Sequence, residues 1–455
     1  MTHTLSPRAR VLFYGDDFTG ASDNAAQYAR HGLRTRLYFS NPGWQSLQVA
    51  ASECDVIGVA GTARSLDPAA MTDELLPVLQ DFACLNVPLV QYKCCSTFDS
   101  AAHTGSLGHA IRLMRQVWPD CFVPVHAATP EFGRYTLFGH HFARAGVEVY
   151  RLDRHPVMSA HPVTPMNESD LALVLKEQGF TPERLIDLRM LDQCQSYPED
   201  LSLALLKADS ALFDGYTQSQ AVTTAAVLWQ LSRQRQVCAM AAQGLAHGMG
   251  QYLRESGQLA ADTPVQQLAA TDRLLVLSGS CSALSAAQID AARQSGFLCM
   301  RLSNNILSGQ DAAGFADLHQ KILQALQAGQ SVVVFTAEGP QDPHTAQLRK
   351  LTEHWSSAEL TQRIGNCFAQ LAGRAFRETA LTRLVVAGGD SSSFTMRALG
   401  AEALQIKASH FTQNAHFASL VSSDPQIHGK EVLLKGGQVG TASLYALALD
   451  GFGSL

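Results

Sequence analysis

The chain lacks several of the motifs that would each point to a function at once. Its 455 residues contain no GxxxxGK[ST] loop and no GxGxxG motif after the first predicted strand. Its ten cysteines include no CxxC pair, and its 16 histidines form no HExxH or HxxxH array. A P-loop, a disulfide framework and a structural zinc site are therefore disfavoured, and we predict no structural metal.

Charged residues are also scarce, at 16% of the chain, with a formal net charge of −6. No basic stripe is visible, so we expect no nucleic-acid partner, because binding a phosphate backbone needs clustered Lys and Arg. No apolar run is long enough to span a membrane, and the first residues, MTHTLSPRARVLFYGDD, show no signal-peptide core. We therefore expect a cytoplasmic protein with no membrane partner.

What the chain does contain is an alternation of short apolar runs and amphipathic segments, which is typical of parallel sheets covered by helices. The expected fold class is α/β: two α/β domains, each with a mainly parallel sheet flanked by helices, and an active-site cleft between them. Strands are expected at residues 10–17, 35–39, 55–61, 89–93, 121–127, 210–215, 273–280, 331–337 and 382–389, and helices at 18–32 and 68–83.

The length exceeds what one hydrophobic core usually supports, so two domains are expected. We place the boundary between residues 1–255 and 256–455, and interpret the polar stretch 245–272 as the linker.

The most informative stretch is an apolar run, 384–387, that leads into Gly388-Gly389-Asp390-Ser391 and a predicted helix. Free amides at a helix start and the helix dipole favour an anion, and glycines let a ligand approach closely. A second glycine loop, Lys435-Gly436-Gly437 followed by Gly440, adds a cation. The two loops together predict a nucleotide phosphate pocket.

A third loop in the same half, with Ser280 and Ser282, follows another predicted strand and precedes a helix. Its hydroxyls are suited to bind a ribose or a phosphate, although helix capping explains Ser282 equally well.

In the first half, Asp16 and Asp17 follow the first predicted strand, with the Thr19 hydroxyl beside them. Ligands of open α/β sheets bind outside the carboxyl ends of the strands. Two carboxylates there are suited to bind a polyol, and one can accept a proton from a substrate hydroxyl. The alternative is that Asp16 caps the following helix and Asp17 is solvated.

Three further loops bring cations. Lys93 ends a strand and can hold a carboxylate or a phosphoryl group, or it is an ordinary surface lysine. Arg134, after Gly133, can bind a carboxylate with its guanidinium fork. Arg64 is a weaker candidate of the same kind. Taken singly, each of these signals is weak; their combination with the glycine loops favours a site that joins a nucleotide and a small polar substrate.

Five segments, in this order along the chain, resemble the four-carbon acid-sugar kinases, a family that includes 3-oxo-tetronate, threonate and erythronate kinases. The segments are GDDFTGASDNA (15–25), GRYTLFGHHFA (133–143), SGSCSALSAAQI (278–289), LTRLVVAGGDSSS (381–393) and LLKGGQVG (433–440). The resemblance covers nearly the whole chain, and it is the ordered set that is specific.

The resemblance implies an ATP-dependent kinase whose N-terminal domain binds an acid sugar and whose C-terminal domain binds ATP with Mg²⁺. The substrate side would involve Asp16, Asp17, Lys93, Gly133 and Arg134. The nucleotide contacts would fall on Ser280 or Ser282, on Gly388, Gly389, Asp390 and Ser391, and on Gly437 or Gly440. In this interpretation Asp17 is the base, Lys435 adds a positive charge, and Asp390 is a candidate partner of Mg²⁺.

One segment departs from the family pattern K-x-D-S-T-L-R-G-N-x-G. The chain has K-C-C-S-T-F-D-S from Lys93 on, so Cys95 replaces an acid and Asp99 replaces an arginine, while Ser96 is retained. With that arginine missing, carboxylate binding would pass to Arg134 or Arg64, or the substrate differs from a plain tetronate. We therefore expect an oxidised or branched acid sugar, such as a 3-oxo acid.

Two other classes remain open from the sequence: a nucleotide-dependent dehydrogenase and a two-domain sugar-acid binding protein without catalysis. The first is opposed by the acids at the end of the first strand, which would repel a pyrophosphate. The second usually requires export, for which no signal is visible. A homodimer is common for such enzymes, but no residue demands one.

Overall fold

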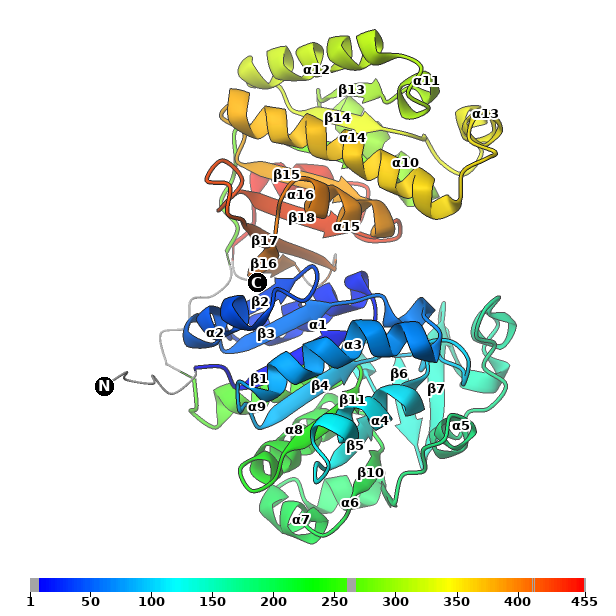
Figure 1. The fold of residues 1–455 in the computed structure, drawn as a ribbon, viewed down its shortest axis with the longest axis vertical. Helices are drawn as coiled ribbons and strands as arrows, with labels where there is room; N and C mark the ends of the chain where they lie inside the picture. Colours follow the sequence, from blue (N-terminus) through cyan, green and yellow to red (C-terminus); the bar gives the residue numbers. More distant parts are fainter. Residues whose placement is uncertain (1–7, 260–266, 411, 413, 454–455) are drawn as a thin grey trace. The chain divides into compact units, whose positions relative to one another are not determined.

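The structure is a computed structural model that describes residues 8–259, 267–410, 412 and 414–453, with only the backbone of residues 357, 358 and 390. The chain divides into two compact units, Met1–Pro264 and Val265–Leu455, which are described separately (Figure 1). In the described part of the chain, no helix combines the length and the apolar character that crossing a membrane requires.

Unit 1 is built on a parallel sheet with neighbouring strands in the order β2-β3-β1-β4-β11-β5-β10-β9. The central strands are apolar and buried throughout, as expected when helices cover both faces of a parallel sheet. The strands are β1 (Val11–Gly15), β2 (Thr35–Tyr38), β3 (Val56–Ala60), β4 (Leu89–Lys93), β5 (Val123–His126), β9 (Arg184–Ile186), β10 (Ser210–Phe213) and β11 (Val237–Ala241).

Helices connect these strands, and capping residues define where several of them begin. Asp67 caps the helix that starts at Pro68, and Thr217 with Gln220 forms a capping box at another. The helices are α1 (Phe18–Ala29), α2 (Trp44–Glu53), α3 (Pro68–Ala83), α4 (Leu107–Val117), α5 (Leu171–Glu177), α6 (Leu188–Gln193), α7 (Pro198–Leu205), α8 (Gln218–Ser232) and α9 (Gln243–Glu255). Helix α3 packs against α4, and α9 packs against α1 and α8.

A small antiparallel sheet, β6 (Arg134–Leu137), β7 (His140–Ala145) and β8 (Glu148–Arg151), extends from the region after β5. Residues 133–140 were expected to form a loop. The expectation was wrong for Arg134 and Thr136, which pair with Ala143 and His141 of β7. The real turn is the short Phe138-Gly139 segment, where both residues adopt positive φ.

Unit 2 also has a mainly parallel sheet, with the order β13-β14-β12-β15-β18-β17-β16. Only β17 runs antiparallel to both of its neighbours among these strands. The strands are β12 (Leu275–Ser278), β13 (Leu298–Arg301), β14 (Val332–Phe335), β15 (Arg383–Ala387), β16 (Ala403–His410), β17 (Ala415–Val421) and β18 (Glu431–Lys435). The helices are α10 (Ala283–Gln294), α11 (Asn304–Leu307), α12 (Ala312–Gln327), α13 (Pro343–Leu351), α14 (Ser357–Glu378), α15 (Gly389–Ala398) and α16 (Leu444–Asp450). The expected α/β fold class is confirmed.

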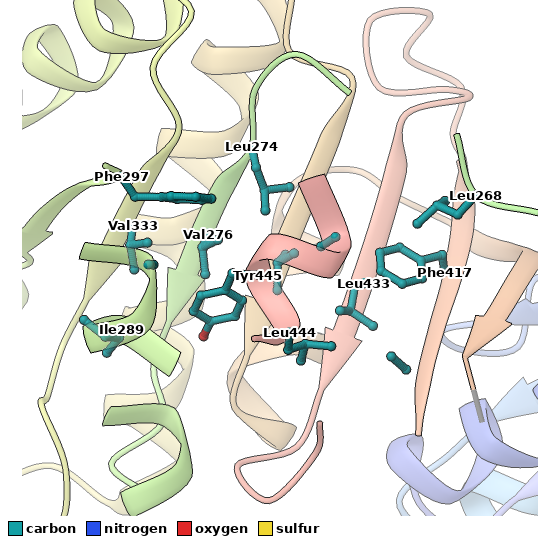
Figure 2. Packing of buried hydrophobic residues seen from close by; sticks show 14 of the residues in the cluster. Leu268, Leu274, Val276, Ile289, Phe297, Val333, Phe417, Leu433, Leu444 and Tyr445 are labelled. Atoms are coloured by element: carbon teal, nitrogen blue, oxygen red, sulfur yellow. The ribbon is translucent and has the colours of Figure 1, made fainter. Parts of the chain in front are cut away.

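The short helix α16 closes one side of the core of unit 2. Figure 2 shows Leu444 and Tyr445 of this helix lying over Val276 of β12 and Leu433 of β18. All four side chains are buried, and full burial of each large apolar side chain contributes about 2 kcal/mol. The core therefore fixes β12 and β18, the strands that lead into the serine and glycine loops, relative to each other.

The interpretation of 245–272 as a linker was wrong for its first part, because α9 continues to Glu255 and belongs to unit 1. Leu245, Met249 and Leu253 are fully buried. Glycine within this stretch allows close helix packing: a Cβ at Gly248 would collide with the carbonyl oxygen of Ala221 on α8. Residues 260–266 of the expected linker lie outside the described residues.

A buried arginine ties the last helix of unit 2 to its sheet. Arg383 on β15 is 1% exposed and donates to the Glu431 carboxylate, with distances of 2.8 and 2.6 Å. It also donates to the carbonyl oxygens of Ala269 and Ala448, at 2.7 and 2.6 Å. The guanidinium thus joins two strands, the start of unit 2 and α16.

We predict that Arg383→Ala lowers the free energy of unfolding of unit 2 by about 3 kcal/mol or more, because it leaves Glu431 Oε2 and two carbonyl oxygens without their donor. Calorimetry of the full chain would measure the transition of unit 2. Arg374→Ala is the matched control, since Arg374 and its partner Glu378 are 47% and 43% exposed, and it should leave the transition unchanged. Equal effects of the two substitutions would contradict the prediction.

Candidate active-site residues in two units

In unit 1, the neighbouring strands β3, β1, β4 and β11 end at the same edge of the sheet. Gly15 lies opposite Ala60 and Lys93, and Lys93 lies opposite Ala241. Residues opposite each other in a parallel sheet project to the same face, so the small side chains of Gly15, Ala60 and Ala241 leave room for the long side chain of Lys93. The loops that follow β1, β3 and β4 therefore start at the same edge.

Arg64, in the short 3₁₀ helix after β3, binds both aspartates that follow β1. Its Nη2 and Nε donate to the two carboxylate oxygens of Asp16, at 2.7 and 3.1 Å, and Nη2 also donates to Asp17 Oδ1 at 2.6 Å. The bidentate geometry makes the Arg64–Asp16 pair a strong one. Arg64 is thus a central residue of this edge, although the sequence ranked it as a weaker candidate.

Asp17, rather than Asp16, caps helix α1, because Asp17 Oδ1 accepts from the amide of Gly20 at 3.2 Å. Lys93 Nζ lies 3.8 Å from the same oxygen, an ion-pair distance. Glycine at position 20 leaves room for this pair, since a Cβ there would displace Lys93 Nζ and Asp17 Oδ1. No hydrogen bond from the described residues ends on Asp17 Oδ2, so this oxygen is available to a ligand.

The two aspartates differ in burial and in pKa. Asp16 is 1% exposed, and burial raises its pKa although Arg64 and Lys93 oppose the shift. Burial acts on Asp17 as well, but Lys93 and Arg64 outweigh it and hold the pKa of Asp17 below its ordinary value. Asp16 therefore positions Arg64, whereas Asp17 presents an ionised carboxylate with one open oxygen.

The other residues predicted for the substrate side make different contacts. Arg134 donates through Nη1 to the carbonyl oxygens of Phe132, Gly133 and Arg144, at 2.9, 3.3 and 3.3 Å, and to no carboxylate of the described residues. Gly133 has a φ of +68°, which allows the turn into β6. Thr19 is exposed in the first turn of α1.

Ser96 and Asp99 contact the segments that surround the β4 loop. The carbonyl oxygen of Ser96 lies 2.8 Å from Nε2 of the buried His141 on β7. The carboxylate of Asp99 accepts from the Thr164 hydroxyl and lies 3.9 Å from His161 Nδ1. Asp99 therefore anchors the 161–164 segment in this structure, a contact that the sequence could not reveal because the partners are more than 60 residues away.

In unit 2, strand ends are again aligned. Ala387 lies opposite Ser278 and Lys435, so that the loops after β12, β15 and β18 begin side by side. Backbone hydrogen bonds continue past the strands, from Gly279 N to the carbonyl oxygen of Ala387 at 2.8 Å and from Gly388 N to that of Lys435 at 2.9 Å. The structure thus brings together the three loops that the sequence selected in this half.

Serine hydroxyls connect these loops. Ser282 caps α10 through the amide of Ser285 at 3.0 Å and also donates to the carbonyl oxygen of Gly437 at 2.5 Å. Ser282 Oγ lies 3.3 Å from Ser280 Oγ. Capping therefore does explain Ser282, as the sequence allowed, and the same hydroxyl holds the second glycine loop in place.

Glycines at the meeting point leave no room for side chains. Gly388 has a φ of +125°, and a Cβ there would collide with Ser391 Oγ. A Cβ at Gly437 would lie 2.8 Å from Ser280 Oγ. Gly389 begins α15, so its amide is one of those that the helix leaves unpaired.

The remaining residues predicted for the nucleotide side lie in or beside these loops. A Cβ at Gly436 would make only an ordinary contact with Val439 at 3.7 Å, whereas Gly440 has a φ of +87° and a Cβ there would lie 2.7 Å from Leu444 Cδ2. The side chain of Asp390 lies outside the described residues. No group of three or more His, Cys, Asp or Glu residues suited to a metal ion occurs in the described part of the chain.

Lys435 is a buried cation with no acidic partner among the described side chains. It is 2% exposed, and its Nζ lies 3.4 Å from Ser285 Oγ, while no carboxylate of the described side chains lies within ion-pair distance. Burial lowers the pKa of Lys435 to about 8. The sequence identified Lys435 but missed Ser285, whose only sequence signal is its position three residues after the capping Ser282.

Two family models match the chain over most of its length. One, described as a sugar-binding N-terminal domain, matches residues 11–249, and the other, described as a nucleotide-binding C-terminal domain, matches residues 275–444. The chain is also 35% identical to a 3-oxo-isoapionate kinase of Paraburkholderia graminis, over 97% of this chain and 94% of the relative. The chain belongs to the four-carbon acid-sugar kinase family. The identification made from the sequence motifs is confirmed.

The chain is also similar to another member of the acid-sugar kinase family. A 3-oxo-tetronate kinase of Pseudomonas savastanoi pv. phaseolicola is 29% identical over 95% of each chain. The dehydrogenase and the non-catalytic binding protein that the sequence left open are not favoured by these relatives.

Solved structures share the fold. A protein from Salmonella typhimurium LT2 has a TM-score of 0.77 at 23% identity, and one from Haemophilus influenzae has a TM-score of 0.75 at 21% identity. Each comparison covers 96% of this chain and 98% of the other.

We predict that Lys435→Met raises the free energy of unfolding of unit 2 at pH 7 by about 3 kcal/mol. The pKa of Lys435 is about 8 in the folded chain and has its ordinary value of 10.5 in the unfolded chain, so the folded chain holds the proton less tightly. Because the pKa of Lys435 is lowered in the folded chain, the destabilisation by its buried ammonium is complete below about pH 8. It decreases as the pH rises toward 10.5. Denaturant unfolding at pH 7 and pH 10 would measure it.

The exposed Lys350 provides the control, since Lys350→Met should have little effect at either pH. A loss of stability in Lys435→Met that is the same at both pH values would contradict the prediction and show that the ammonium is stabilised in the fold.

Proposed function

We propose that this acid-sugar kinase transfers the terminal phosphoryl group of ATP to a hydroxyl of a four-carbon or branched acid sugar, such as a 3-oxo acid. The observation that carries the proposal is the carboxylate of Asp17, which Arg64 and Lys93 hold at the strand edge with Oδ2 open to a ligand. A fixed carboxylate with one open oxygen is suited to orient the hydroxyl that attacks the phosphoryl group.

Asp17 acts in this mechanism mainly by orientation. Its lowered pKa makes it a weak base, but it is ionised throughout the neutral range and ready to accept a hydrogen bond from the substrate hydroxyl. The hydroxyl needs to lose its proton only late, as the bond to phosphorus forms, so a weak base is sufficient. Lys93, whose Nζ lies 3.8 Å from Asp17 Oδ1, adds a positive charge near the reacting groups.

The residues of unit 2 fit the phosphates of ATP. Lys435 is a buried ammonium with a hydroxyl neighbour and no carboxylate of the described side chains to neutralise it, and an anion would complete its environment. Gly388, Gly389 and Gly437 allow backbone amides to approach a phosphate closely. Ser280, Ser282 and Ser391 supply hydroxyls beside the same loops.

Mg²⁺ would bind chiefly to the phosphates of the nucleotide, because the described residues contain no cluster of carboxylates at these loops. Bound there, it would neutralise charge on the transferring phosphoryl group. The candidate protein ligand of Mg²⁺ is Asp390, as predicted from the sequence.

The nature of the acid sugar is supported by the names of the relatives, which are 3-oxo-isoapionate and 3-oxo-tetronate kinases. Both names describe an oxidised acid sugar, in agreement with the 3-oxo acid expected from the changes at Cys95 and Asp99. Domain roles, the cytoplasmic location and the homodimer remain predictions from the sequence.

We predict that the chain releases ADP with at least one member of a panel of four- and five-carbon acid sugars and their 3-oxo forms, in a coupled assay with Mg²⁺. Asp17→Asn should lower kcat by about 10²–10⁴-fold, since the amide cannot accept the proton. The exposed Asp73, on α3, provides the control, and Asp73→Asn should turn over normally. Near-normal turnover of a folded Asp17→Asn enzyme would remove Asp17 from this role.

A further inference from the structure

His141 on β7 is fully buried, and both nitrogens of its ring have a hydrogen-bond partner. Nε2 lies 2.8 Å from the carbonyl oxygen of Ser96, in the loop after β4, and Nδ1 lies 3.0 Å from Thr136 Oγ1 on β6. A carbonyl oxygen can only accept, so Nε2 carries the proton and Nδ1 accepts from the Thr136 hydroxyl. The two contacts therefore fix one neutral tautomer of the ring.

The surroundings of the ring agree with a neutral imidazole. Burial lowers the pKa of His141 to about 4; the contact with the Ser96 carbonyl opposes this shift, and Arg134 and His126 add to it. The ring is thus uncharged at neutral pH, as the hydrogen-bond pattern requires.

Thr136, which sets this tautomer, is itself held in place. Its side chain is fully buried, and its backbone N–H and carbonyl oxygen both form hydrogen bonds of 2.9 Å with Gly215, just after β10. Thr136 also pairs with His141 across β6 and β7. The small sheet is thereby attached to the main sheet of unit 1 and provides a fixed base for the imidazole.

The loop after β4 turns sharply next to this imidazole. The amide of Phe98 donates to the carbonyl oxygen of Cys95 at 2.9 Å, and Phe98 has a φ of +57°. In the described part of the chain, Ser96 takes part in one hydrogen bond, the one from His141 to its carbonyl oxygen. The half-buried hydroxyl of Ser96 is therefore available to a ligand, while its backbone is held by His141 alone.

We propose that His141 is a positioning residue of this kinase: by holding the carbonyl oxygen of Ser96, it orients the Ser96 hydroxyl for the acid sugar. This inference rests on the proposed function. A hydroxyl at this position can donate to a carboxylate or carbonyl oxygen of the ligand, or accept from one of its hydroxyls. Without the imidazole, Ser96 loses its one hydrogen bond, so that its hydroxyl adopts several orientations and binds the ligand less tightly.

The test measures acid binding by calorimetric titration of the full chain, and KM and kcat by ADP release, with the acid of the panel that binds most tightly. His141→Leu should raise the Kd and the KM of this acid by about tenfold, the effect of one hydrogen bond. It should leave kcat and the KM of ATP unchanged, because uniform binding is lost. His141→Gln should bind like the wild type, since its amide nitrogen lies as many bonds from Cβ as Nε2 and donates to the same carbonyl oxygen.

A double-mutant cycle shows whether His141 acts through Ser96. Ser96→Ala should raise the Kd of the acid by a similar factor, and adding His141→Leu to Ser96→Ala should change it little further. His319→Leu is the control, because His319 is also a buried histidine, 5% exposed, but lies on α12 in unit 2. It should leave the Kd of the acid unchanged.

The inference is overturned if His141→Leu lowers kcat or the unfolding temperature without raising the Kd of the acid. It is also overturned if His141→Leu weakens binding equally with and without Ser96→Ala, or if His141→Gln binds as weakly as His141→Leu. His141→Met, which also lacks a donor, replaces the leucine variant if that variant does not fold. An unchanged Kd in Ser96→Ala would by itself overturn the inference.

The two proposals fail separately. Acid binding that depends on His141 and Ser96 as expected, without ADP release for any acid of the panel, would refute the kinase proposal and leave the role of His141 intact. ADP release by the wild type, together with an unchanged Kd and KM in a folded His141→Leu enzyme, would refute the role of His141 and leave the kinase proposal intact. A wild type that binds no acid of the panel would refute both.

Discussion

The arrangement of the candidate substrate site depends on one guanidinium. Arg64 reaches from the loop after β3 to both aspartates after β1, and binds Asp16 with two hydrogen bonds and Asp17 with a third. Asp16 is buried, so its charge is tolerated only because this partner is present. With Arg64 held in this way, Asp17 keeps one oxygen for its helix cap and cations and the other for a ligand.

Buried cations have carboxylate partners in unit 1, whereas the buried lysine of unit 2 has none among the described side chains. In unit 1, Lys93 and Arg64 are compensated by the aspartates beside them, whereas Arg134 donates to carbonyl oxygens and to no carboxylate of the described residues. In unit 2, Lys435 is buried with a hydroxyl neighbour, and burial holds its pKa near 8. An uncompensated buried cation costs free energy in the empty protein, and binding of an anion recovers it. Under the proposed function, the anions would be the carboxylate of the acid sugar in unit 1 and the phosphates of ATP in unit 2.

Strands and long helices could be predicted because their signals are local. The apolar run before Lys93 and the amphipathic segment 68–83 were placed with the bounds that the structure has. The failures concern packing and pairing between distant segments. The first part of the polar stretch that was interpreted as a linker belongs to α9, whose glycines allow close helix packing, and the pairing of β6 with β7 turned an expected loop into a sheet. Neither the packing partner of a glycine nor the pairing of a strand is encoded in the adjacent residues.

The sequence by itself determined which residues carry chemistry: acids and cations at strand ends in the first half, glycines, serines and a lysine in the second, and a family to which this ordered set belongs. Residue type and position relative to a strand are local properties, so they can be read without coordinates. Only the tertiary structure decided which carboxylate is buried and which is open, that Arg64 joins both, and that Asp99 contacts Thr164. These depend on the register of distant strands, which brings residues far apart in the chain to one edge of a sheet.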